Sequence, residues 1–139
     1  MKLNKVFIDS NILIYAYDRS ARSKREAAKR LISDLITTGL GTISTQVLQE
    51  FYVVSTKKLG IIPELAKTAI ESLRALEIVT LSPELILSAI DTQLNWDISF
   101  WDALILQAAS HSNCKILYTE DFSHGQSYGS VKVVNPFIL

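Results

Sequence analysis

Short apolar runs of strand-forming residues alternate along this chain with longer stretches of helical periodicity. The first run, Val6-Phe7-Ile8, is apolar at every position, which is typical of a strand covered on both faces, as in a parallel sheet. Because strands alternate with helices throughout, the sequence predicts an α/β fold with a central, mostly parallel sheet flanked by helices. Further strands are expected at residues 42–43, 78–81, 115–119 and 131–134.

The helices between these strands have recognisable start and stop signals. Ser10 is expected to cap a first helix that carries Tyr17. Gly39 and Gly41 are expected to end the second helix, in which bases lie between apolar positions at helical spacing. Helices are expected over residues 23–37, 45–59, 63–76, from 83 onward and 99–112, and a polar loop over residues 120–130.

A length of 139 residues suits one compact domain, and we expect a single domain over residues 1–139. The 14 Lys and Arg balance the 14 Asp and Glu, so the chain lacks the basic excess of a typical nucleic-acid-binding protein. The balance hides an order: residues 1–40 hold eight bases and four acids, whereas residues 81–139 hold two bases and six acids. A neutral total therefore does not exclude a nucleic-acid enzyme.

Several common classes of protein do not fit this sequence. Cys114 is the only cysteine, so the chain forms no internal disulfide and no cysteine-based metal cage. We expect no signal peptide and no membrane span, since no apolar run reaches ~18 residues. Neither a Gly-x-Gly-x-x-Gly fingerprint nor a phosphate-binding Gly-Lys-Ser/Thr loop occurs. We expect a cytoplasmic protein.

Two acids follow apolar strands at the end where open α/β sheets bind ligands. Asp9 comes directly after Val6-Phe7-Ile8, and Asp121 lies two residues beyond Thr119, the last residue of a later expected strand. Either acid alone also suits a turn former or a helix cap. Together they make the carboxyl edge of the sheet the first place to look for chemistry.

Two further acids lie on helices. Glu50 shares a helix face with Val47 and Val54, where a carboxylate is costly unless it is paired or bound to a cation, although it also suits the edge of that face. Asp102 follows the expected cap Ser99 by three residues, so it suits a capping box and the helix dipole. It is nevertheless embedded among bulky residues.

Four clustered carboxylates would repel one another, and a divalent cation resolves that repulsion. Mg²⁺ prefers hard oxygen ligands, and a water activated by the ion can attack a phosphodiester. No convincing serine, cysteine or histidine nucleophile is present. His111 is expected to be structural or exposed, whereas His124 lies in a loop beside Asp121, from which it could reach a substrate.

In order and spacing, the chain resembles the PIN-domain nucleases, and especially the VapC-type toxin ribonucleases of toxin–antitoxin pairs. The resemblance covers nearly the whole chain, and each motif is short. It rests on Phe7-Ile8-Asp9-Ser10-Asn11, Glu50, Ser99-Phe100-Trp101-Asp102-Ala103-Leu104, Leu117-Tyr118-Thr119-Glu120-Asp121-Phe122, and the ending from His124-Gly125-Gln126 to Val134-Asn135-Pro136-Phe137.

The resemblance implies a PIN-like three-layer fold and a metal site built from Asp9, Glu50, Asp102 and Asp121. The family pattern selects Asp121 over Glu120, although Glu120 can still contribute. It further implies RNA cleavage with Mg²⁺ or Mn²⁺, frequent homodimers and a cognate antitoxin. Small polar residues are expected to support the acids: Ser10, Asn11 and Thr119.

Other features leave alternatives open. A basic stretch is either a solvated helix face or a rim that holds RNA phosphates: Arg19, Arg22, Lys24, Arg25, Lys29 and Arg30. Trp96, Phe100 and Trp101 are expected to pack in the core or where a helix begins, with base stacking as the alternative. The other functions considered are an inactive PIN-like module that binds RNA or protein, and a Mg²⁺-binding phospho-receiver domain. The receiver domain would need a lysine at the end of a late strand, which this chain lacks.

Overall fold

A computed structural model of the protein describes residues 4–138; residues 1–3 and residue 139 of the expected domain lie outside the described residues. The strands are β1 Val6–Ile8, β2 Gly41–Ser44, β3 Glu77–Val79, β4 Ile116–Tyr118, β5 Ser127–Tyr128 and β6 Val131–Val134. The helices are α1 Ser10–Tyr15, α2 Ser23–Thr38, α3 Thr45–Lys57, α4 Pro63–Leu73, α5 Pro83–Trp96 and α6 Phe100–His111, with a 3₁₀ turn η1 at Arg19–Ala21.

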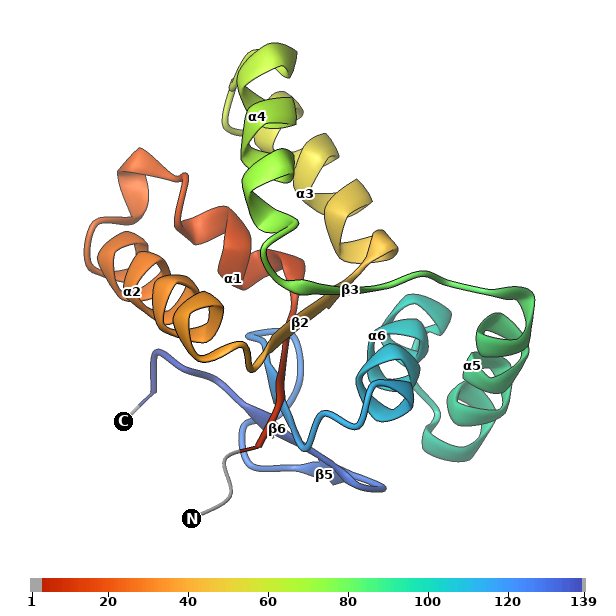
Figure 1. The fold of residues 1–139 in the computed structure, drawn as a ribbon. Helices are drawn as coiled ribbons and strands as arrows, with labels where there is room; N and C mark the ends of the chain where they lie inside the picture. The colour runs from red at the N-terminus through yellow and green to blue at the C-terminus, as the bar shows by residue number, and fades with distance from the viewer. Residues whose placement is uncertain (1–3, 139) are drawn as a thin grey trace.

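The six strands form one sheet in the order β3-β2-β1-β4-β6-β5. β1 pairs in parallel with β2 and β4, β3 with β2, and β6 with β4, whereas β5 is antiparallel to β6. Helices α1 and α2 lie on one side of the sheet and α5 and α6 on the other (Figure 1). The predicted α/β fold with a mostly parallel sheet between helices is confirmed.

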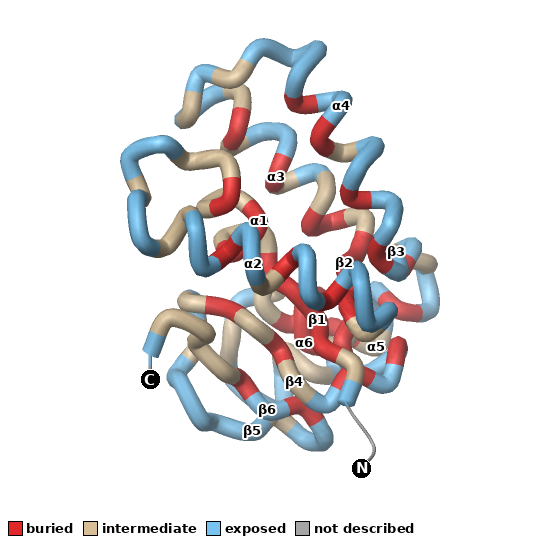
Figure 2. The backbone as a smooth tube through the Cα atoms, turned by 60° about the vertical axis from the view of Figure 1, so that its left-hand side comes forward, coloured by how far each residue is buried: buried red, intermediate tan, exposed pale blue. Residues whose placement is uncertain are grey.

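The core centres on β1, whose neighbours cover it on both faces. Phe7 and Ile8 are fully buried, as the unbroken apolar run predicts. Buried residues concentrate in the strands and in α6, whereas α2 and α4 carry exposed outer faces (Figure 2). α3 packs on α1 and α4 packs on α3, so these helices extend from the sheet on the side of α1. Within residues 4–138, no helix is both long enough and apolar enough to cross a membrane.

Two sequence expectations about glycines have different outcomes. Gly39 ends α2 with a left-handed φ of 70°, as predicted. Gly41 does not end the helix; it is the first residue of β2. A Cβ at Gly41 would lie 2.6 Å from Leu76 Cδ2 and 3.0 Å from Leu35 Cβ. Gly41 therefore allows the helix layer to approach the sheet closely.

Other boundaries also differ from the sequence expectations. α1 ends at Tyr15, so Tyr17 lies beyond it, and α4 ends at Leu73 rather than at residue 76. Within the expected polar loop, Ser127–Tyr128 forms β5 and pairs with β6. A strand of two residues is too short to produce an alternation that sequence patterning can detect.

Candidate metal centre

β1 and β4 are neighbouring parallel strands whose connections leave in opposite directions. The chain leaves β1 through α1 and α2 to reach β2, whereas it enters β4 through α5 and α6 on the opposite side of the sheet. At such a switch point, α/β proteins bind ligands in the region outside the carboxyl ends of the strands, which is termed the crevice. The backbone N–H of Asp9 donates to Tyr118 O at 3.0 Å, which aligns Asp9 with the residues that follow β4.

Asp9 is almost fully buried in this crevice, with 3% of its surface exposed. Its Oδ1 accepts from Ser10 N at 2.7 Å and its Oδ2 from the Thr119 hydroxyl at 2.8 Å. The first contact makes Asp9, rather than Ser10, the cap of α1, which corrects the sequence expectation. The pKa of Asp9 is raised to about 7, mainly because of burial. The two hydrogen bonds act in the opposite direction, and the charges of Asp121 and Glu50 raise the pKa further.

Thr119 connects the two strand-end acids. Its hydroxyl donates to Asp9 and accepts from Asn11 Nδ2 at 3.2 Å and from Asp121 N at 3.0 Å. Both lone pairs and the proton of the hydroxyl are therefore used. Thr119 and Asn11 lie where supporting residues were expected.

Glu50 approaches the crevice from α3 and is half-buried. Ser10 Oγ donates to Glu50 Oε1 at 3.1 Å, and Gln46 Nε2 donates to Glu50 Oε2 at 3.4 Å. The same Gln46 nitrogen donates to Trp101 O at 3.2 Å, so α3 is linked to both α1 and α6. Gln46 lies one helical turn before Glu50, a spacing that offered a signal for its role, but sequence reasoning did not single it out.

Asp102 lies in the first turn of α6, and Ser99 Oγ accepts from its backbone N–H at 3.1 Å. Ser99 is therefore the cap of α6, as predicted. Partial burial raises the pKa of Asp102, a hydrogen bond from the Ser99 side chain to the carboxylate lowers it, and the charge of Asp121 raises it. The charges of Glu50 and Asp121 both act on Asp9, and the charge of Asp121 also acts on Asp102. Electrostatic interactions therefore link the four expected acids.

Glu120 and Asp121 are adjacent in sequence but have different surroundings. Glu120 Oε1 accepts from the Tyr15 hydroxyl at 2.7 Å, and Oε2 accepts from Lys24 Nζ at 2.7 Å. Burial raises the pKa of Glu120, but the bonds from Lys24 and Tyr15 outweigh it and leave that pKa below its usual value. Both Glu120 oxygens are engaged with α1 and α2, whereas Asp121 is exposed at the crevice. Sequence reasoning did not identify Tyr15, because nothing local marks its partner.

The donor set fits a hard divalent cation in its chemistry. Four carboxylates supply the oxygen ligands that Mg²⁺ and Mn²⁺ prefer. The raised pKa of Asp9 shows that its charged form is destabilised where no cation compensates it. Within residues 4–138, however, no three His, Cys, Asp or Glu side chains are close enough together to hold an ion as they stand. The acids therefore face one region without forming a closed set of ligands.

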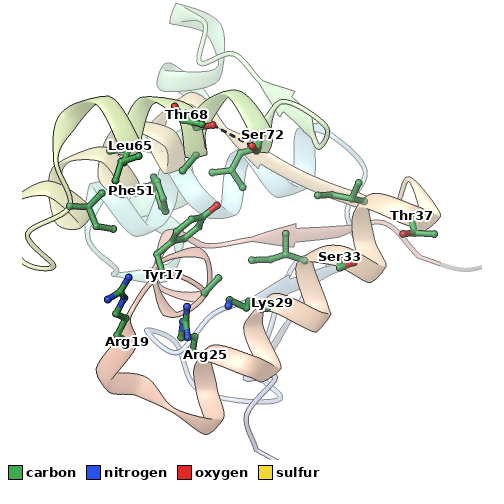
Figure 3. Close-up of a pocket in the computed structure, with 17 residues that line it drawn as sticks. Tyr17, Arg19, Arg25, Lys29, Ser33, Thr37, Phe51, Leu65, Thr68 and Ser72 are labelled. Carbon is green, nitrogen blue, oxygen red and sulfur yellow. Dashed lines mark hydrogen bonds between the residues drawn. The ribbon is translucent and has the colours of Figure 1, made fainter.

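The basic stretch divides between two places. Lys24 pairs with Glu120 beside the crevice, whereas Arg22 is exposed in the turn before α2. Arg19, Arg25 and Lys29 instead line a cavity of about 720 Å³ between α2 and α4. Figure 3 shows these three bases near Tyr17, with apolar residues such as Phe51 and Leu65 across from them. Arg25 Nε is buried and has no hydrogen-bond partner in the described part of the chain.

The tryptophans lie outside the core. Trp101 is 63% exposed but packs edge-to-face on Phe100 where α6 begins, and Trp96 is 43% exposed and packs on Tyr128, whereas Phe100 itself packs against the core. His111 is exposed, as expected. His124 is exposed too, and its Nδ1 accepts from Asn135 N at 3.0 Å, which ties its loop to the segment after β6.

Comparison with known proteins agrees with this architecture. The chain matches the model of the PIN domain family over residues 6–126. No curated protein sequence matches it. A toxin–antitoxin complex from Klebsiella pneumoniae is similar in fold, with 20% identity over 97% of this chain and 100% of that one and a TM-score of 0.73. The sarcin–ricin-loop-cleaving toxin VapC20 of Mycobacterium tuberculosis is 19% identical over 84% of this chain and 90% of its own, with a TM-score of 0.67. DNA-bound VapBC from Salmonella typhimurium is 15% identical over 94% of this chain and 97% of the matched chain, with a TM-score of 0.69.

Proposed function

The chain belongs to the PIN domain family, and we propose that it is a metal-dependent endoribonuclease that acts as the toxin of a toxin–antitoxin pair. The observation that carries this proposal is buried Asp9 at the switch point, with its raised pKa and with Glu50 and Asp121 within range of its charge. Support comes from VapC20, a toxin of similar fold that cleaves the sarcin–ricin loop. Residues 1–139 would form one cytoplasmic domain.

Asp9, Glu50, Asp102 and Asp121 would hold Mg²⁺ or Mn²⁺, with Asp121 rather than Glu120 as the fourth ligand. Such an ion activates water and stabilises the negative charge that develops on a phosphodiester. The chain's own residues prepare this site. Thr119 fixes Asp9 relative to the backbone of Asp121, and Ser10 holds Glu50 toward α1. These contacts limit the side-chain entropy lost when the acids bind a common ion.

Positive charge for RNA phosphates would come from the basic stretch: Arg19, Arg22, Lys24, Arg25 and Lys29. Lys24 is the member whose position is tied to the crevice, through Glu120. The expected binding weakens with salt, because phosphate contacts release counterions.

An antitoxin segment would occupy the cavity between α2 and α4. The lining is mostly apolar, and Arg19, Arg25 and Lys29 carry positive charge on one side. A helix with an apolar face and carboxylates at its edge complements both features. Such a segment would cover three bases of the RNA-binding stretch, so antitoxin and RNA would compete. Substituting Arg25→Gln is expected to weaken antitoxin binding, measured by calorimetry, and Arg22→Gln is the exposed control.

A homodimer is also part of the proposal. Leu87, Ile90 and Leu94 are exposed on one side of α5, at 64%, 40% and 75%. The exposed acid Asp91 lies on the same side of the helix, so two copies of this face would have to meet with their Asp91 carboxylates apart or in solvent. Leu94→Glu should then convert a dimer to a monomer in sedimentation analysis.

The decisive experiment incubates partner-free protein with tRNA, rRNA and mRNA plus Mn²⁺ and maps the cut ends. Cleavage that stops in EDTA and in both Asp9→Asn and Asp102→Asn supports the proposal. Full cleavage in EDTA would overturn the metal mechanism. Failure to cleave any RNA, together with no Mn²⁺ binding in calorimetry, would favour the inactive PIN-like module instead.

A further inference from the structure

Gln46 is a buried polar residue that lies beside the candidate metal centre without being one of its acids. It is in the first turn of α3, one turn before Glu50, and 4% of its surface is exposed. Its Nε2 donates to Glu50 Oε2 at 3.4 Å and to Trp101 O at 3.2 Å. Because both of these partners are acceptors, they fix which end of the side-chain amide carries the nitrogen.

The oxygen at the other end of this amide has no donor. Gln46 Oε1 is buried and accepts no hydrogen bond from the part of the chain that the structure describes. A buried acceptor without a donor disfavours folding, since it has given up its hydrogen bonds with water. An apolar side chain of the same size would avoid this penalty. Packing alone therefore does not explain a glutamine at this position.

The two hydrogen bonds of Gln46 connect the helices that carry Glu50 and Asp102. α3 packs on α1, which lies on one side of the sheet, whereas α6 lies on the other side (Figure 1). Trp101, whose carbonyl receives one of the bonds, directly precedes Asp102 in the first turn of α6. One side chain therefore joins the backbone next to Asp102 to the carboxylate of Glu50.

The carboxylate of Glu50 is held at both of its oxygens. Ser10 Oγ donates to Oε1 at 3.1 Å, and Gln46 Nε2 donates to Oε2. A carboxylate oxygen has about two lone pairs, so each oxygen keeps one that can face a cation. Hydrogen-bond partners of this kind orient the ligands of metal sites, and metal affinity falls when they are removed.

Neither acceptor depends on Gln46 to avoid being buried without a partner. The carbonyl of Trp101 lies in the first turn of α6, where the helix supplies a backbone N–H from four residues later. Glu50 is half-buried, so water reaches it, and it keeps the bond from Ser10. Removing the amide of Gln46 would thus create no new unpaired group, and it would remove an existing one.

We infer that Gln46 is a positioning residue for the candidate metal centre: it fixes the Glu50 carboxylate relative to Asp102, so that both acids can bind one divalent cation. This inference rests on the proposed metal-dependent function and adds a neutral residue to the four acids. The amide is kept at the expense of folding stability, because the metal site requires it.

The effect on stability separates this role from a structural one. Gln46→Met replaces the amide with an unbranched apolar side chain of similar size. For partner-free protein in EDTA, we expect a urea midpoint equal to or above that of the parent, because an unpaired buried oxygen is removed. The Mn²⁺ dissociation constant in calorimetry should nevertheless rise about tenfold. Gln49→Met, which changes an exposed glutamine of the same helix, is the matched control and should alter neither quantity.

Double variants test whether Gln46 acts through Glu50. In a Glu50→Gln background, Gln46→Met should weaken the remaining Mn²⁺ binding by less than about threefold, since no carboxylate is left to orient. In an Asp121→Asn background, the loss should again be about tenfold. The reason is that no hydrogen bond joins Gln46 to Asp121 within residues 4–138. The EPR signal of free Mn²⁺ measures these weaker affinities.

Each outcome distinguishes this inference from the proposed function. Equal Mn²⁺ affinity in Gln46→Met and the parent would overturn the inference and leave the ribonuclease standing. A lower urea midpoint for Gln46→Met would also overturn it, since Gln46 would then be a structural residue. Equal losses in the two double variants would exclude action through Glu50. A parent protein that folds but binds no Mn²⁺ would overturn the proposed function and this inference together.

Discussion

The hydroxyl of Thr119 donates to Asp9 Oδ2 at 2.8 Å, although the two residues are 110 positions apart in the sequence. The same oxygen accepts from Asn11 and from the backbone of Asp121. One buried hydroxyl therefore sets the relative positions of two proposed metal ligands.

Removing that hydroxyl should affect both folding and metal binding. Thr119→Val leaves the buried Asp9 carboxylate with one fewer donor, and it leaves Asn11 and Asp121 N without their acceptor. We expect a loss of about 1–3 kcal/mol in the free energy of unfolding in urea, and weaker Mn²⁺ binding in calorimetry. Thr119→Ser keeps the hydroxyl and should retain most of both. Equal losses in the two variants would show that the methyl group, and not the hydrogen bonds, matters.

The buried carboxyl of Asp9 predicts a pH dependence for the metal-free protein. Its pKa is about 7 in the folded chain against an ordinary value of 3.8, so the folded state keeps a proton that the unfolded chain releases between these pH values. This stabilisation is complete below pH 3.8 and is lost as the pH rises to about 7. From pH 5 to pH 8, the free energy of unfolding should fall by up to about 3 kcal/mol.

Asp9→Asn, which carries no titrating carboxyl, should flatten this pH profile in EDTA. Asp97→Asn, which changes an exposed acid at the end of α5, should leave it unchanged. Saturating Mn²⁺ should remove the decline in the parent protein, because a bound cation favours the ionised carboxylate. A parent profile in EDTA as flat as that of Asp9→Asn would contradict the expectation.

The adjacent acids Glu120 and Asp121 should behave differently toward metal. Both oxygens of Glu120 are engaged by Tyr15 and Lys24, so Glu120→Gln should retain Mn²⁺ affinity within a few-fold. Asp121→Asn should lower that affinity at least tenfold, since it removes a charged oxygen ligand. Isothermal calorimetry of both variants tests this directly. A greater loss in Glu120→Gln than in Asp121→Asn would reverse the assignment.

Gly41 should be intolerant of a side chain. A Cβ there would lie 2.6 Å from Leu76 Cδ2 and 3.0 Å from Leu35 Cβ, and the second atom belongs to the rigid base of its side chain. Gly41→Ala is expected to cost about 1–3 kcal/mol in thermal or chemical unfolding. In a Leu76→Ala background, the additional cost of Gly41→Ala should be smaller, because one of the two close contacts is absent.

Sequence reasoning succeeded where a single local pattern determines the outcome. The apolar run of β1 predicted a buried strand, and the carboxyl-end rule placed Asp9 and Asp121 at one edge of a parallel sheet. It placed the cap of α1 at Ser10 instead of Asp9, because both side chains are good acceptors at that position. Only the fold brings the Asp9 carboxylate to the Ser10 backbone and to Thr119.

Tertiary contacts decided the remaining features. The partners of Glu120 come from α1 and α2, about a hundred residues earlier, so no spacing near Glu120 reveals them. The exposure of Trp101 likewise depends on what the rest of the chain fails to cover. An aromatic residue beside Ala103 and Leu104, both buried in the first turns of α6, has the same local signature whether it is buried or exposed.

The position of β4 in the sheet determines when, during synthesis, the four acids can come together. β1, β2 and β3 are adjacent in the sheet and lie in the first part of the chain, so they can associate while synthesis continues. β4 joins the free edge of β1 only after Ile116–Tyr118 has left the ribosome, and Asp121 follows it. A nascent chain therefore carries three of the four acids before it has the strand that aligns Thr119 with Asp9. The proposed metal site would therefore stay incomplete until β4 and Asp121 have been synthesised.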